Sequence, residues 1–337
     1  MEMVSVIIPA YNSQLYIVGA LQSVLRQTIQ DLEVIVVDDG STDDTFALVS
    51  DIAALDARVA VHRQPNSGRP SCARNAGISK ARGEFICLLD ADDEWHPAKL
   101  ERQLKVAHEH DTAGVVFTDR QFFTVSPDVD AEEPYLRQTH YLERIGAEAM
   151  AKHSGGVYLS GDSLARQMLL GTGLVGAHSS TIMIRRAILE THDLRFREDV
   201  IVAEDTDLFI RMARVTRFAF LDEALSFHRR TPGSISRRTK DRQYAADGLA
   251  TLVPLMEELE DSLSTFEKRE LRDSLADAWL RLGQRAWNGG LKQEARSLFL
   301  KSAKVHPRPS AYIYFAKTSI PLPWIRAYRT WRWGTTD

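Results

Sequence analysis

The chain has little cysteine and no long apolar run. Its 337 residues include only Cys72 and Cys87, and both lie in segments expected to be regular structure. Two isolated cysteines provide neither a disulfide framework nor the paired ligand spacing of a zinc site. No apolar run approaches the ~20 residues that span a bilayer, and the first residues lack the charge pattern of a signal peptide. We therefore expect a cytoplasmic protein.

A strongly basic charge is also lacking. The formal net charge is -4, whereas domains that bind a phosphate backbone usually carry a strongly basic surface. The charge balance therefore argues against nucleic acid as a partner. The length of the chain and its 44% of hydrophobic residues are sufficient for one large core and a smaller module.

The chain does contain a cluster of carboxylates after one of its apolar runs. Asp90, Asp92 and Asp93 directly follow the apolar run from Phe85 to Leu89, where a buried strand is expected to emerge. Like charges this close raise each other's pKa unless a cation compensates them. An Asp-x-Asp pair at a strand end is suited to holding Mg²⁺ or Mn²⁺ against a diphosphate. The alternative is an Asp-rich turn that caps the next helix.

Short apolar runs alternate with amphipathic segments up to Thr118. The runs predict strands at Val4–Ile8, Glu33–Val37, Val59–His62, Phe85–Leu89 and Val115–Thr118, and the intervening segments predict helices at Ser13–Gln27, Thr42–Ala54 and Pro97–Glu109. This alternation predicts an α/β fold with a mainly parallel sheet flanked by helices. In such sheets ligands bind beyond the carboxyl ends of the strands. Three polar segments follow strands in this way: Pro9–Asn12, Asp38–Asp43 and Asp90–Asp93.

The pattern weakens between residues 121 and 176. Glycine-rich breaks at 154–156 and 171–173 indicate a variable insert on the substrate side. Order returns in the next sixty residues, for which we expect a strand at His178–Arg185, a helix at Asp205–Arg214 and a short strand pair at Phe218–Leu221 and Leu225–Arg229.

Four motifs, in this order and spacing, resemble the family 2 glycosyltransferases, an inverting family with the GT-A fold. They are VSVIIPAYN (4–12), VVDDGSTDDT (36–45), ARNAG (73–77) and LLDADD (88–93). The resemblance covers roughly residues 3 to 236. It implies a GT-A domain over residues 1–238, with a nucleotide-binding half at about 1–118 and an acceptor half at about 119–238.

The resemblance implies that the nucleotide-sugar donor binds along the first three motifs. The substrate-binding residues expected in the first motif are Pro9, Ala10, Tyr11 and Asn12, among which Tyr11 offers an aromatic surface. Asp39 is expected to accept an N–H of the base, which the resemblance implies is uracil. Asp38 either contacts the ligand or makes a helix-capping turn. Arg74 either reaches the nucleotide or is an ordinary solvated charge.

The resemblance also assigns the metal and the base. Asp90 and Asp92 align with an Asp-x-Asp pair that binds Mn²⁺ or Mg²⁺ and the ribose, with Asp92 as the expected direct ligand. Glu204 and Asp205 resemble a Glu-Asp motif whose Asp is the general base, and an inverting displacement needs one such base. Glu204 would orient the acceptor or cap the helix. Acidic residues in the first turn of any helix are the structural alternative.

Residues 227–236 depart from a family segment that commonly reads Tyr-Arg-x-His-x-x-Ser-x-Ser. Aligning Ser234 and Ser236 keeps Arg229, the expected diphosphate contact, but puts Thr231 where histidine is frequent. In the family, a histidine in that place can help bind the metal or the diphosphate. This role is then absent here, or a shifted strand passes it to His228 or Arg230. Three roles stay open at this point: those of Asp93, His178 and His228.

Residues 239–337 predict an α-helical extension. Ala276–Lys304 resembles one tetratricopeptide-like helix pair, which is too short for a solenoid. Between Lys301 and Trp333 basic residues alternate with aromatic ones, and this composition suits an anionic membrane surface. The alternative is a helix packed on the preceding pair with its basic face in solvent.

Together these features indicate an inverting glycosyltransferase of the hexosyl- or N-acetylhexosaminyl-transferase type. The expected donor is a nucleotide-diphospho-sugar, expected to be a UDP-sugar, and the expected acceptor is a glycan or lipid-linked hydroxyl in surface polysaccharide or glycolipid synthesis. A lipid-linked acceptor would make peripheral contact with the inner face of the membrane useful. The alternative is a catalytically silent adaptor that acts through its helical tail, but Asp39, Asp92 and Asp205 are all retained.

Overall fold

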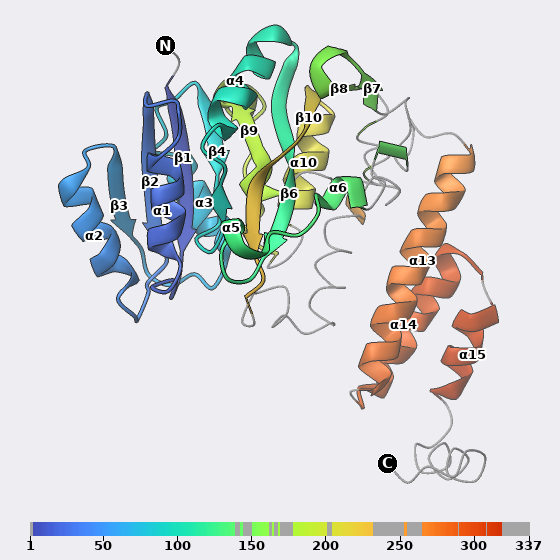
Figure 1. The fold of residues 1–337 in the computed structure, drawn as a ribbon. Helices are drawn as coiled ribbons and strands as arrows, with labels where there is room; N and C mark the ends of the chain where they lie inside the picture. The colour runs from blue at the N-terminus through green and yellow to red at the C-terminus, as the bar shows by residue number, and fades with distance from the viewer. Residues whose placement is uncertain are drawn as a thin grey trace. The chain divides into compact units, whose positions relative to one another are not determined.

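The computed structural model describes residues 3–138, 142–143, 150–161, 164, 168, 178–200, 204–231, 253–254, 265–288, 290–307 and 309–318. The chain divides into two compact units, Met1–Arg238 and Thr239–Asp337 (Figure 1). Several sequence predictions lie outside the described residues: the glycine-rich break at 171–173, the aligned Ser234 and Ser236, and the tail beyond residue 318.

The first unit begins with four parallel strands in the order β3-β2-β1-β4. The strands and their helices are β1 (Val4–Ala10), α1 (Ile17–Leu25), β2 (Leu32–Asp38), α2 (Thr45–Leu55), β3 (Val59–Arg63), α3 (Pro70–Ile78) and β4 (Phe85–Leu88). β1, β2 and β4 are almost continuously buried, as expected of parallel strands covered on both faces. A methyl group at Gly77 would overlap Ile7, so glycine allows α3 to pack closely on β1.

The sheet continues as a mixed one. The next elements are β5 (Glu94–Trp95), α4 (Lys99–Glu109), β6 (Ala113–Phe123), α5 (Pro127–Asp130), α6 (Tyr135–Gln138), β7 (Met150–Lys152), η1 (Ser154–Gly156), β8 (Val157–Ser160), η2 (Ser179–Thr181), β9 (Ile182–Arg185), α9 (Arg186–Thr191), α10 (Glu204–Ala213) and β10 (Arg217–Arg229). β9 is antiparallel to both β4 and β6, whereas β6 and β10 are parallel. The predicted α/β class with a mainly parallel sheet is confirmed.

Two local predictions are wrong. The strand pair at Phe218–Leu221 and Leu225–Arg229 is the single strand β10, whose register against β6 shifts twice between Leu221 and Ser226. Extra residues accommodated as bulges keep one strand continuous where the sequence suggests a turn. Residues 179–181 are not extended, because they form a 3₁₀ turn that the His178 side chain caps by accepting the Ser180 N–H, and β9 starts only at Ile182.

The second unit contains α13 (Thr265–Asn288), α14 (Lys292–Val305) and α15 (Pro309–Lys317). α13 and α14 share an apolar cluster that includes Leu282, Ala286, Trp287, Ala295, Leu298 and Phe299. Gly283 lies against the Phe299 ring, where a methyl group would overlap it. Among the described residues, no helix combines the length and apolarity needed to cross a membrane.

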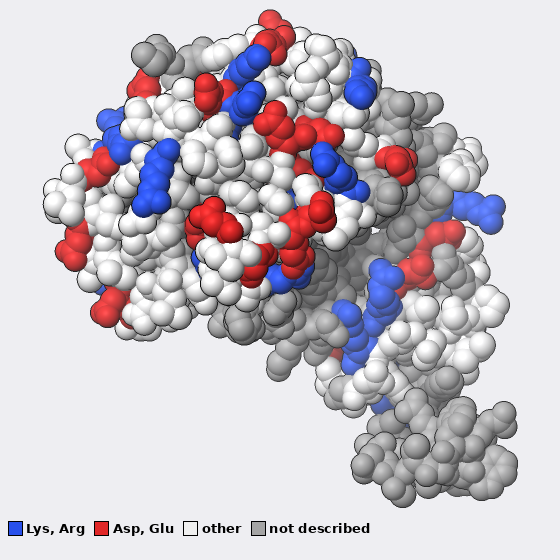
Figure 2. All heavy atoms as spheres, in the orientation of Figure 1, with Lys and Arg blue, Asp and Glu red and all other residues white. Residues whose placement is uncertain are grey.

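Charged side chains of both signs are interspersed on the face of the molecule that Figure 2 shows. Exposed pairs of opposite charge in the described structure include Lys105 with Glu109 and Arg102 with Glu223. Pairs of this kind contribute little to stability. Buried and half-buried charges lie instead at the carboxyl ends of the strands.

Candidate active site

The loops that follow β1 and β2 are bound to each other. Asn12 has a left-handed φ of 49°, a conformation that asparagine tolerates well. Its Oδ1 accepts the Thr42 N–H at 2.8 Å, and its own N–H donates to Ser41 Oγ at 3.0 Å. The Asp39 N–H donates to the Ala10 carbonyl at 2.8 Å. The predicted substrate-binding loop is thus held in place, and it leaves the Tyr11 side chain exposed.

The two adjacent aspartates after β2 make different contacts. Buried Asp38 accepts the Ser41 N–H at 3.2 Å and lies 3.2 Å from Arg63 Nε, which supports its turn role. Asp39 accepts Gln64 Nε2 at 2.7 Å and Ser67 Oγ at 2.9 Å, while the Ser67 N–H is shared between its two oxygens. A carboxylate offers about four acceptor positions. Asp39 can therefore accept a further N–H without losing these contacts.

Arg74 is buried and bridges two distant carboxylates, so the solvated-charge alternative is wrong. Its Nη1 donates to Glu204 Oε1 and its Nη2 to Asp90 Oδ1, both at 2.7 Å. Burial opposes the charge on Arg74, but the two carboxylates outweigh it and raise the pKa of the guanidinium. We call Arg74, Asp90 and Glu204 the arginine bridge. It fixes the start of α10, and hence Asp205, beside the end of β4.

The bridge separates the pKa values of its two carboxyl groups. Burial opposes ionisation of Asp90, but Arg74 and then His178 outweigh it and lower its pKa. Burial dominates at Glu204 and raises its pKa despite Arg74. Asp205 follows on α10, where its Oδ1 accepts the Thr206 N–H at 2.7 Å. An ionised Asp90 thus lies beside the segment that carries the predicted base.

Asp92 and Asp93 lack a comparable cationic bridge among their described contacts. Asp92 Oδ2 accepts the Thr231 hydroxyl at 3.1 Å, and burial followed by the charge of Asp90 raises its pKa. Asp93 accepts Ser180 Oγ at 2.6 Å and the Arg229 N–H at 3.1 Å. Burial and its two acidic neighbours raise the pKa of Asp93 well above its usual range. Carboxylates that resist ionisation for this reason fit a divalent cation, which would compensate them.

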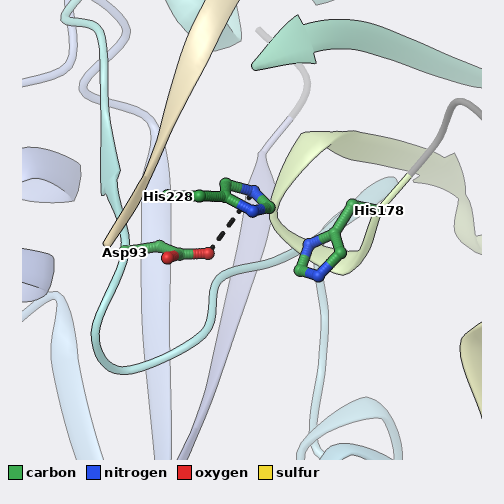
Figure 3. A group of neighbouring side chains, drawn as sticks. All are labelled: Asp93, His178 and His228. Carbon is green, nitrogen blue, oxygen red and sulfur yellow. Dashed lines mark ion pairs between the residues drawn. The ribbon is translucent and has the colours of Figure 1, made fainter. Parts of the chain in front are cut away.

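Two histidines complete this region, as Figure 3 shows. His228 Nε2 lies 3.4 Å from Asp93 Oδ2, and the His178 and His228 rings have centroids 4.2 Å apart. Burial, more than any charge, lowers the pKa of both imidazoles and keeps them neutral. We call Asp92, Asp93, His178 and His228 the acidic cluster. No sequence spacing joins its members, because they come from the turn after β4, from the residue that precedes η2 and from β10.

Arg229 at the end of β10 and Arg230 directly after it face other partners. Arg229 Nη2 donates to Glu94 Oε1 at 2.8 Å, and its guanidinium lies 4.3 Å from the centroid of the Phe123 ring. Its backbone N–H donates to Asp93, and the charge of its guanidinium opposes the rise in the pKa of Asp92. Its side-chain contact with a diphosphate stays a prediction. Arg230 makes two hydrogen bonds to Glu132 at 2.7 and 2.6 Å. Of the two substitutes for the family histidine, the structure places His228, not Arg230, beside the acidic cluster.

Sequence reasoning missed Arg120 on β6. Its buried guanidinium lies 4.2 Å from the centroid of the Tyr135 ring. Burial lowers its pKa, whereas the charges of Asp205 and Asp93 act in the opposite direction. The charge of Arg120 therefore interacts with the predicted base and with Asp93 of the acidic cluster. The available signal was the polar pair Asp119-Arg120 directly after the apolar run Val115–Thr118, because polar residues after an apolar run also singled out the segments after β1, β2 and β4.

Comparison with known proteins agrees with the motifs. A family model described as glycosyl transferase family 2 matches residues 5–192. The chain belongs to glycosyltransferase family 2. It is 31% identical over 248 residues to "Uncharacterized glycosyltransferase EpsJ" of Bacillus subtilis, a match that covers 69% of this chain and 63% of the relative. It is 30% identical over 224 residues to the hyaluronan synthase of Pasteurella multocida, covering 66% of this chain and 20% of that protein. The family 2 chain thus spans less than two thirds of the length of these relatives.

Solved structures share the fold of the family 2 chain. Staphylococcus aureus TarS 1–349 in complex with UDP-GlcNAc has a TM-score of 0.58 at 21% identity, covering 100% of this chain and 94% of TarS. The mannosyltransferase PcManGT from Pyrobaculum calidifontis, in complex with GDP-Man and Mn²⁺, has a TM-score of 0.55 at 20% identity, covering 97% and 82%. The predicted GT-A fold is therefore confirmed.

Proposed function

We propose that this chain is an inverting glycosyltransferase that moves a hexosyl or N-acetylhexosaminyl group from a nucleotide-diphospho-sugar to a hydroxyl of a glycan or lipid-linked acceptor. The observation that carries the proposal is the arginine bridge, in which one buried guanidinium holds Asp90 and Glu204 at 2.7 Å each. It joins the donor-side motif to the segment with the predicted base. Family membership and the UDP-GlcNAc complex of TarS support a UDP-sugar donor.

On the donor side, the rigid loops after β1 and β2 receive the nucleotide. The exposed Tyr11 ring gives the base a surface, and Asp39 has acceptor capacity left for a base N–H. Asp92, with Asp90 beside it, would hold Mn²⁺ or Mg²⁺, because both offer the oxygen ligands that these cations prefer. When bound there, the cation supplies Lewis-acid stabilisation of the nucleoside diphosphate that departs.

On the acceptor side, Asp205 takes the proton from the attacking hydroxyl. A single displacement with inversion needs one such base, which contributes about 10²- to 10⁴-fold in rate. Glu204 is fixed by Arg74, so the first turn of α10 is held while Asp205 stays half-exposed toward the acceptor.

The test is a panel of nucleotide sugars assayed with Mn²⁺ for binding and for release of nucleoside diphosphate. We expect Asp205→Asn to bind the donor with unchanged affinity but to turn over about 10²- to 10⁴-fold more slowly, because only the base is lost. Asp51→Asn, at an exposed position on α2, is the matched control and should keep full turnover. Full turnover by Asp205→Asn would remove it from the base role.

We further propose that the tail meets an anionic membrane surface at the inner face of the cell membrane. The proposal is tested on residues 319–337, which hold most of the arginines and tryptophans of this tail. A chain truncated after Thr318 keeps α15 and should lose flotation with anionic liposomes; equal flotation of both chains would contradict membrane contact by the tail.

A further inference from the structure

We propose that Asp93, His178 and His228 form a second cation site, which takes a divalent transition metal such as Zn²⁺ through two imidazoles and one carboxylate. This set is distinct from the oxygen-only pair Asp90 and Asp92. Ligand atoms of all three residues lie within 4.8 Å of one another, and in Figure 3 the two rings and the carboxylate converge on one region.

The spacing of the atoms matches coordination better than hydrogen bonding. His228 Nε2 and Asp93 Oδ2 are 3.4 Å apart, which is too long for a charge-assisted hydrogen bond of about 2.7–2.9 Å. Two ligands at about 2.1 Å from a tetrahedral cation are about 3.4 Å from each other. The observed separation is therefore that of one edge of a coordination tetrahedron.

The buried side chain of His228 supports the cation site independently of these distances. Its side chain is only 7% exposed, and its Nε2 has no hydrogen-bond partner in the described structure. Buried polar atoms nearly always have a partner, and each exception calls for an explanation such as an ion. A cation at the common point of the three side chains would give this nitrogen its partner.

The surrounding contacts orient the carboxylate as they do in metal sites. Ser180 Oγ donates to Asp93 Oδ2 at 2.6 Å, while the Ser180 carbonyl accepts Trp95 Nε1 at 2.7 Å and Ser226 Oγ at 2.9 Å. Hydrogen bonds of this kind hold ligating carboxylates in position. His178 Nδ1 accepts the Ser180 N–H at 3.3 Å, so binding through this ring gives up at most one long hydrogen bond.

The donor set predicts which cations bind. Imidazole nitrogens favour Zn²⁺, Co²⁺ and related metals, whereas Mg²⁺ prefers oxygen ligands. Three protein ligands leave one tetrahedral position open for water or an anionic oxygen. The acidic cluster would thus hold two different cation sites next to each other: a nitrogen-containing one, and the oxygen-only one formed by Asp92 with Asp90 of the arginine bridge.

The experiment titrates the untagged full chain, freed of metal by a chelator, with Co²⁺. We expect one Co²⁺ per chain with the intense visible absorption of tetrahedral coordination, displaced by Zn²⁺ but not by excess Mg²⁺. His178→Ala, at the least buried ligand, should weaken Co²⁺ binding about tenfold or more, as should Asp93→Asn. His192→Ala, an exposed histidine on another segment, is the matched control and should bind as the unchanged chain does.

Three results would overturn the proposal: no tetrahedral absorption from the unchanged chain, unchanged binding by His178→Ala, or loss of the Co²⁺ signal in Asp92→Ala, which would assign the cation to the oxygen-only pair. Circular dichroism confirms that each variant is folded, and the spectrum of the unchanged chain decides independently of any variant. The readout is metal binding, so it can fail or succeed whether or not the chain transfers a sugar.

Discussion

The arginine bridge and the acidic cluster lie side by side at the end of β4, yet they handle buried charge in opposite ways. In the bridge, Arg74 lies 2.7 Å from both Asp90 and Glu204 and outweighs the cost of burying Asp90. In the cluster, Asp93 lies next to imidazoles held neutral by burial, and the pKa values of both Asp92 and Asp93 are raised. The fold supplies a buried cation, Arg74, to one region, whereas for the other region we propose a bound metal ion.

The difference separates structure from ligand binding. The charges of the arginine bridge compensate each other, so the bridge holds the start of α10, and with it Asp205, in place before any substrate binds. A charge that the chain leaves uncompensated costs stability until a cation binds. Disrupting the bridge should therefore cost folding stability, whereas neutralising the cluster should cost cation binding.

The largest effect on stability is expected from Arg74→Met. It leaves Asp90 and Glu204 without their cation, and breaking a buried pair of this kind costs about 3–5 kcal/mol in the free energy of unfolding. Arg102→Met is the matched control, because Arg102 is half-exposed and lies 3.8 Å from Glu223, so its loss should cost less than about 1 kcal/mol. Urea unfolding measures both. Equal costs for the two variants would mean that the bridge does not hold the site together.

A smaller effect on the free energy of unfolding is expected when a single aspartate is replaced in metal-free protein, and its sign differs between the two regions. The folded pKa of Asp93 is raised above the usual 3.8, so the folded state binds more protons than the unfolded one. Stability from this group is present below pH 3.8 and is lost as the pH rises through the folded pKa. Asp90 has a lowered pKa, so its contribution is present at neutral pH and is lost as the pH falls through that value.

At pH 7 we therefore expect Asp93→Asn to be as stable as the unchanged chain or more stable, and Asp90→Asn to be less stable by about 1–3 kcal/mol. Unfolding free energies between pH 4 and 8 in the presence of a chelator check both. In Asp93→Asn the decline of stability with rising pH should flatten. A decline of unchanged slope would show that another group causes it.

Much of the fold was predictable because its signals are local. The apolar runs marked β1, β2, β4 and β6, since a strand buried on both faces needs continuous apolar residues, and a shorter run marked the edge strand β3. The continuity of β10 was not predictable, because a bulge depends on the neighbouring strand and leaves no sequence signal between Leu221 and Ser226. The 3₁₀ turn at 179–181 was missed because it depends on one side-chain contact of His178.

The position of a site residue was predictable where a single sequence motif contains both the strand end and the residue that follows it. Asn12 and Asp39 lie at strand ends, as their motifs predict. The role of Arg74 was not predictable, since its partner Glu204 is 130 residues away in the sequence. The aligned position of Thr231 did lead to a contact with Asp92. The joining of Asp93 to His178 and His228 requires three segments to fold together, so only the structure could show it.

The central claim is that the carboxylates of Asp92 and Asp93 are compensated by a divalent cation, and that this cation strengthens binding of the donor. The most direct measurement is calorimetric titration of UDP-GlcNAc with and without Mn²⁺, on the unchanged chain, on Asp92→Ala and on the exposed-site control Asp51→Asn. The account predicts that Mn²⁺ strengthens binding at least tenfold in the unchanged chain and in Asp51→Asn, and that Asp92→Ala loses this gain. Binding that is equally strong without Mn²⁺, or that responds to Mn²⁺ in Asp92→Ala as in the unchanged chain, would contradict it.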